Sequence, residues 1–199
     1  MFGLREIPIV ASLSGLLVSA GGPVILAGFV RAQGLERQKS LVKKWGGWPT
    51  SQRLAVVSAE RRARLESVTG FPLPEQTTAN LDVYGEITGV LIAKTRDTDR
   101  FRLLFEENRN YGFERNLLGV KPIGISVSVL TLVLALVATV LLARSGGATS
   151  AEHVAGLVVL LLIVLFWVFY PSESRAKELA FKYADRLIEA SDELPQHNA

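Results

Sequence analysis

Two long runs without a charged residue constrain the fold of this chain more than any other feature. Ile123–Ala143 contains 21 residues and Val154–Tyr170 contains 17, and neither run holds Asp, Glu, Lys, Arg or His. A helix needs about 20 apolar residues, with a range of about 17 to 25, to cross the hydrocarbon core of a bilayer. A small soluble core rarely hides two such helices, so both runs are predicted to span a membrane as helices.

A third uncharged run, Ile7–Val30, contains four glycines and two prolines. It can be read in three ways: as a kinked span, as a signal peptide cleaved after Val18-Ser19-Ala20, or as a re-entrant hairpin that turns at Gly21-Gly22-Pro23. Cleavage after Ala20 would export the basic region that follows. The distribution of charge therefore favours a retained span with the N-terminus outside, and the hairpin stays the alternative.

Basic residues are concentrated between and after the apolar runs. Residues 31–121 contain 16 Lys or Arg against 11 Asp or Glu, the loop at 144–153 has one basic residue, and the tail after Tyr170 has four. Lys and Arg accumulate on the cytoplasmic side of membrane proteins. We therefore expect a multi-pass protein of the bacterial cytoplasmic (inner) membrane, with its middle region and C-terminus in the cytoplasm.

These signals predict an all-α integral membrane protein with about three transmembrane helices and a helical cytoplasmic unit. The expected segments are transmembrane helix 1 at 1–30, the cytoplasmic unit at 31–120, transmembrane helix 2 at 121–143, an external loop at 144–153, transmembrane helix 3 at 154–170, and a cytoplasmic amphipathic helix and tail at 171–199.

Within the cytoplasmic unit, the apolar spacing predicts helices at 51–68 and 79–94 and a third helix that carries Phe101 and Leu104. Asp97 or Thr98 is the expected N-cap of the third helix. Trp45 and Trp48 fit either the headgroup region or a small cytoplasmic core. The tail from Ser172 has an apolar stripe at helical spacing, which must be buried on the rest of the unit or on another subunit.

The residue types present exclude several kinds of chemistry. The chain has no Cys, so it has no disulfide, thiolate metal site or Cys nucleophile. His153 and His197 have no partner cluster in the sequence, and there is no P-loop, GxGxxG or zinc-ligand spacing. We expect no enzyme activity and no cofactor or metal. The net charge of +3 is explained by topology and gives no case for nucleic acid.

Small side chains recur on one face of two of the predicted spans, where they allow close helix packing and hydrogen bonds between helices. These candidate oligomer or pore residues are Ala11, Gly15, Ser19 and Gly22 in the first run, and Gly124, Ser128, Thr131, Ala135, Ala138 and Thr139 in the second. Packing between the two spans of one chain is one reading. Packing between subunits, with the hydroxyls of Ser128, Thr131 and Thr139 facing a narrow pore, is the other.

A polar and aromatic segment precedes the second run and is the expected membrane-interface site. Its candidate residues are Arg109, Tyr111, Gly112, Phe113, Arg115, Asn116 and Lys121. The basic residues suit lipid phosphates, the aromatic residues suit the interface, and Gly112 permits a bend. The segment is read either as an interfacial elbow or as a hinge that couples the cytoplasmic unit to the spans.

The stretches "WGGWPT", "TRDTDRF", "FEENRNYGF", "RNLLGVKPIGI" and "KELAFKYADRL" resemble a group of small bacterial multi-span membrane proteins associated with anti-phage defence loci. The resemblance covers most of the chain from Trp45 onward. It implies a membrane-disrupting effector. Two arginines follow "YGF" in the group's pattern, and Glu114 replaces the first of them here.

The sequence therefore leaves two alternative functions. One is a homo-oligomeric, membrane-perturbing or channel-like effector of a defence system, with membrane lipid as its target. The other is a non-catalytic accessory subunit that anchors or regulates a cytoplasmic protein partner.

Overall fold

The computed structural model describes residues 7–74, 84–148 and 150–195, with side chains described from residue 21 onward. Over these residues the chain is all-helical and has no strand, which confirms the predicted class of secondary structure. The helices are α1 (Ile7–Trp45), α2 (Pro49–Leu54), α3 (Ala59–Thr69), α4 (Gly85–Lys94), α5 (Arg102–Arg144), α6 (Ala151–Phe169), α7 (Glu173–Glu189) and the 3-10 helix η2 (Ala190–Glu193).

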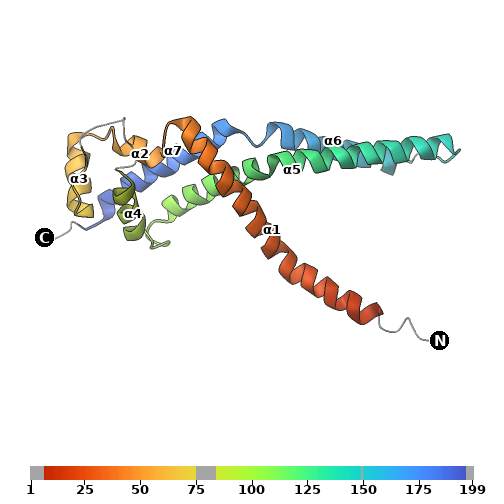
Figure 1. Cartoon of the computed structure of the whole chain (residues 1–199), viewed down its shortest axis with the longest axis horizontal. Coiled ribbons are helices and arrows are strands. Elements are labelled where there is room, and N and C mark those ends of the chain that lie inside the picture. Colours follow the sequence, from red (N-terminus) through yellow and green to blue (C-terminus); the bar gives the residue numbers. More distant parts are fainter. Residues whose placement is uncertain (1–6, 75–83, 149, 196–199) are drawn as a thin grey trace.

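The second half of α5 and the whole of α6 lie side by side at one end of the molecule (Figure 1). The helices of the core do not cover this pair. Both helices are long and apolar enough to cross a membrane. In their most apolar 18-residue windows, only 6% of α5 and none of α6 is buried inside the molecule. The apolar side chains of this pair are thus turned outward rather than into a core.

The other end of the molecule is a small helical core in which α7 packs on α2, α4 and the first half of α5. Helices α2, α3, α4 and α7 gather there in Figure 1. Tyr84, Leu65, Leu91 and Leu187 are fully buried at its centre. The amphipathic tail helix α7 begins after Ser172, whose hydroxyl accepts a hydrogen bond from the Arg175 backbone N–H at 3.3 Å. The stripe predicted for the tail packs on α2 and α5 of the same chain.

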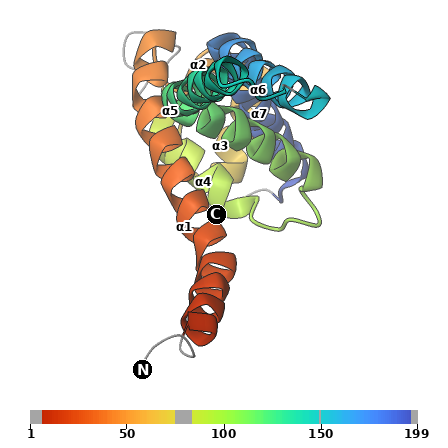
Figure 2. The same cartoon turned by 90° about the vertical axis from the view of Figure 1, so that its right-hand side faces the viewer.

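Helix α1 crosses α5 and then diverges, so that its N-terminal half points away from the α5–α6 pair in both views (Figures 1 and 2). The helix contains Gly21-Gly22-Pro23 without interruption. The re-entrant hairpin considered at those residues is therefore wrong.

Two details of the helices between α1 and the apolar part of α5 differ from the expected ones. The single helix predicted at 51–68 is wrong: α2 ends at Leu54, and Ser58 caps a separate helix α3 by accepting from the Arg61 N–H at 3.3 Å. The break lets α2 pack on α7 while α3 packs on α4 and η2. Asp97 accepts from the N–H groups of Asp99 and Arg100, both at 3.0 Å, in the turn before α5, whose N-cap is Phe101. The first residues of the helix predicted at 79–94 lie outside the described part.

Candidate functional site at the base of the apolar helices

Helices α1 and α5 meet the turn between α6 and α7 where the uncharged part of α5 begins. We call this region the helix junction and define it by Gln38, Glu114, Arg115, Lys121, Glu173 and Arg175. It connects the apolar helices to the helical core.

The crossing of α1 over α5 is set by two glycines. Gly34 of α1 lies against Asn116, and Gly119 of α5 lies against the backbone of Gln33 and Gly34. A Cβ on Gly119 would come within 2.5–2.6 Å of those backbone atoms, and no side-chain rotation could relieve this overlap. The two helices can therefore approach this closely only because Gly34 and Gly119 have no side chain.

An ion pair between a buried carboxylate and an exposed arginine fastens the start of α7 to α5. Glu114 is only 2% exposed, and its carboxylate lies 2.9 Å from the Arg175 guanidinium. Arg175 also donates to the Tyr170 hydroxyl at 3.2 Å and stacks 4.2 Å from the centre of that ring. These contacts raise the pKa of Arg175, the Tyr170 hydrogen bond most and then Glu114. A buried carboxylate without a partner is costly, so the contact with Arg175 offsets part of the cost of burying Glu114.

Lys121 fixes the end of α6 against α5. Its ammonium donates to the carbonyl oxygens of Val168 and Pro171, both at 2.9 Å. The last carbonyls of a helix have no partner within the helix and carry its negative dipole end, where a cation is stabilising. Lys121 therefore serves as a cap for α6. The expectation that it reaches out to lipid phosphates is replaced by this internal role.

Glu173 joins α1 to α7. Its carboxylate accepts hydrogen bonds from Arg37 at 2.7 Å and from Lys44, both on α1. The hydrogen bond from Lys44 is the largest cause that lowers the pKa of Glu173, and partial burial opposes it. The first turn of α7 is also the favourable end of a helix for a carboxylate.

Arg115 occupies the other side of the crossing. It donates to Asn116 Oδ1 at 3.3 and 3.2 Å and to Gln38 Oε1 at 3.1 Å, and it lies 5.8 Å from the centre of the Tyr111 ring. Burial is the main cause that lowers the pKa of Arg115. Burial also raises the pKa of Tyr111, while Arg115 and Gln38 oppose the rise.

The structure brings some of the predicted interface residues together and leaves others apart. Tyr111, Arg115, Asn116 and Lys121 face α1 or α6, whereas Arg109 and Phe113 are exposed to the surroundings. Helix α5 runs through Gly112 and Pro122 without a break, so no elbow with free backbone groups forms here.

The sequence did not point to four junction residues, which are Gln38, Glu114, Glu173 and Arg175. The serine cap before Glu173 was a usable signal for the start of α7. The burial of Glu114 had no local signal, because it depends on Arg175, which lies 61 residues further along the chain.

The small face of α5 lies partly against α6 and partly along the groove beside α1. Gly124 lies against the Trp167 ring, and a cavity of about 360 Å³ between the two helices is lined by Ala135, Ala138 and Thr139 of α5. The hydroxyls of Ser128, Thr131 and Thr139 donate to carbonyls one turn earlier in α5, at 2.7–2.8 Å. Gly22 is partly exposed on α1, and the side chains of Ala11, Gly15 and Ser19 lie outside the described part.

An apolar groove of about 490 Å³ opens between the diverging part of α1 and the α5–α6 pair. Leu26 and Phe29 form its α1 side, and Val127, Ile163 and Trp167 form the opposite walls. The groove exists because α1 contacts α5 at the glycine crossing and not beyond it.

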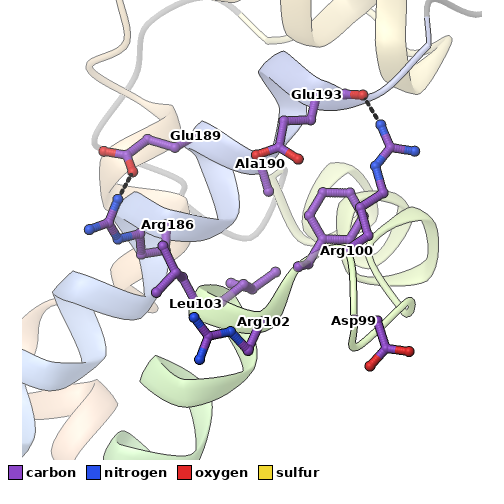
Figure 3. A pocket seen from close by; sticks show the side chains of 10 residues that line it. Asp99, Arg100, Arg102, Leu103, Arg186, Glu189, Ala190 and Glu193 are labelled. Carbon is purple, nitrogen blue, oxygen red and sulfur yellow. Dashed lines mark hydrogen bonds and ion pairs between the residues drawn. The ribbon is translucent and has the colours of Figure 1, made fainter.

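A second cavity, of about 270 Å³, lies in the helical core between the start of α5 and the end of α7 (Figure 3). Arg186 pairs with Glu189 at 2.7 Å, and Arg100 donates to the Glu193 carbonyl. These arginines are thus already engaged by the chain. Among the described residues, no group of three His, Cys, Asp or Glu side chains is placed to hold a metal ion.

No protein-family model, curated protein or solved structure matches this chain significantly. The resemblance to proteins of defence loci therefore stays a prediction.

Proposed function

We propose that this is a non-catalytic protein of the bacterial cytoplasmic membrane in which α1, α5 and α6 span the bilayer and carry a helical cytoplasmic unit. The observation that supports this most is the exposure of α6, which has no buried residue among its 19 residues. In water, each Å² of such apolar surface would cost roughly 25 cal/mol. Lipid removes this cost, and the excess of Lys and Arg in residues 31–121 supports a cytoplasmic location for the helical core.

The helix junction supports an accessory role. Its ion pairs and the Lys121 cap join α1, α5, α6 and α7 directly, so the helical core is held at the membrane face rather than tethered by a flexible linker. Trp48 and Val56 are 50% and 64% exposed on that core and offer apolar surface to a partner. The proposed function is to anchor or regulate a cytoplasmic protein at the membrane.

A homo-oligomeric, membrane-perturbing effector is the second candidate, and the divergence of α1 favours it. Val24 and Ile25 are more than 70% exposed on a helix half that its own chain leaves uncovered. Part of the small face of α5 is covered by α6, whereas Val24 and Ile25 of α1 are uncovered, so assembly would use α1. The hydroxyls that were expected to line a pore are bonded within α5, which favours the accessory role over a channel.

Topology is tested on the natural Cys-free chain by single cysteines in place of Glu60 and Ala148. We expect resistance to carbonate extraction, labelling of residue 148 by an impermeant maleimide in intact cells, and labelling of residue 60 only after lysis. Release by carbonate would refute membrane insertion, and external labelling at 60 would refute the orientation.

The same cells separate the two candidate functions. An accessory subunit should leave the membrane potential intact when expressed alone and should retain one stoichiometric partner in mild detergent, with loss of that partner in Trp48→Ala. Collapse of the membrane potential on expression alone would favour the effector instead.

A further inference from the structure

Arg31 of α1 and Arg115 of α5 both lie near the crossing of the two helices. Arg31 is the first charged residue after the uncharged run of α1. Arg31, Gly34 and Gln38 recur at intervals of three and four residues, so they share one face of α1. Gly34 touches Asn116, and Gln38 accepts from Arg115, so this face of α1 is turned toward Arg115.

Neither guanidinium is neutralised within the described part of the chain. Arg31 is exposed and has no hydrogen bond or ion pair there. Arg115 uses three of its five N–H groups on the neutral amide oxygens of Asn116 and Gln38, which leaves two donors free. Arg37 and Arg175 differ in this respect, because each reaches a carboxylate.

The two cations are also close enough to repel each other. The charge of Arg31 contributes to lowering the pKa of Arg115, in addition to the larger effect of burial. A site that holds like charges together without an internal counter-ion is suited to an external anion.

We propose that the α1–α5 crossing binds the phosphate of an anionic phospholipid headgroup between Arg31 and Arg115. Guanidinium groups bind phosphate through paired N–H donors, and a neutral bilayer surface would leave the two charges uncompensated. This inference rests on the proposed membrane insertion, which puts Arg31 at the end of a span. Basic pockets between transmembrane helices on the cytoplasmic side are typical lipid sites.

A lipid fits better than free phosphate because of the surroundings of the pair. Residues 24–30 of α1 are uncharged, and Val24 and Ile25 are exposed there, so acyl chains can lie along the helix directly beyond Arg31. Lys121 is not part of this site, since it is bonded to Val168 and Pro171.

The test uses the full-length protein, purified in detergent and stripped of lipid, and native mass spectrometry after addition of phosphatidylglycerol or phosphatidylcholine. The wild type should retain phosphatidylglycerol at least tenfold better than phosphatidylcholine. Arg31→Gln should reduce this preference several-fold, and Arg31→Gln with Arg115→Gln should abolish it. Arg109→Gln is the matched control, because Arg109 is exposed on the same helix and should not alter the preference.

An unchanged preference in Arg31→Gln would overturn the proposal, and this variant removes no contact of the described fold. Equal loss in Arg109→Gln would also overturn it, because nonspecific charge would then explain binding. Displacement of the lipid by millimolar inorganic phosphate would show that the site takes free phosphate rather than a lipid. Carbonate extraction of each variant reports membrane insertion separately, so failure of this inference is distinguishable from failure of the proposed function.

Discussion

Gly112 and Gly119 lie seven residues apart on α5, but Gly112 faces open space and Gly119 packs against α1. A Cβ on Gly112 would meet nothing within 4 Å, whereas one on Gly119 would overlap the backbone of α1. The same substitution should therefore act with opposite sign at the two positions.

We expect Gly119→Ala to destabilise the protein by about 1–3 kcal/mol, because α1 and α5 must move apart. Gly112→Ala should be neutral or stabilise by up to about 1 kcal/mol, because alanine is the better helix former. Thermal unfolding in detergent measures both. If Gly119→Ala were as stable as Gly112→Ala, the close crossing would be wrong. If Gly112→Ala impaired function while raising stability, the hinge predicted at that residue would gain support.

At the scale of helices, the contact between α1 and α7 should depend on pH through Glu173. Its pKa lies below the ordinary 4.5 in the folded protein, so the carboxylate releases its proton more easily there than in the unfolded chain. The stabilisation is therefore complete above about pH 4.5 and is lost as the pH falls through the lowered value. Its size should be modest, about 1 kcal/mol, because the pair is partly solvated.

Hydrogen exchange of the first turns of α7 measures this effect. Exchange should become faster, relative to the intrinsic rate, as the pH falls below about 4.5 and the Glu173 carboxylate gains a proton. In Glu173→Gln the same amides should show less of this change. Identical pH profiles in both proteins would rule out Glu173 as the group responsible.

The sequence predicted the apolar helices better than it predicted the junction. The runs of α5 and α6 and the stripe of α7 are local patterns, and their helices formed where those patterns occur. The split between α2 and α3 was missed because the Ser58 cap lies beside residues that also suit a continuous helix. The contact of Gly34 with Asn116 could not be read from either segment alone, since it depends on how two helices cross.

At the scale of the whole molecule, the N-terminal half of α1 points away from the α5–α6 pair (Figure 1). The second candidate function puts a copy of the chain against this helix. A cysteine in place of Ile25 should then give cross-linked dimers with a short bismaleimide in native membranes, at higher yield than a cysteine in place of Leu162 on α6. Both positions are exposed in the monomer, at 74% and 58%. Equal yields would remove α1 as the assembly surface.

The continuity of α5 has a mechanical consequence. About 20 residues of this helix, 102–121, extend below its uncharged part, a length of roughly 30 Å at 1.5 Å per residue. Long apolar spans answer a thinner bilayer by tilting. Because no loop interrupts the rod, a tilt of about 10° would swing its lower end through roughly 5 Å. If α5 spans a bilayer as proposed, a change in membrane thickness would therefore move the helices packed around Phe101 and Leu104.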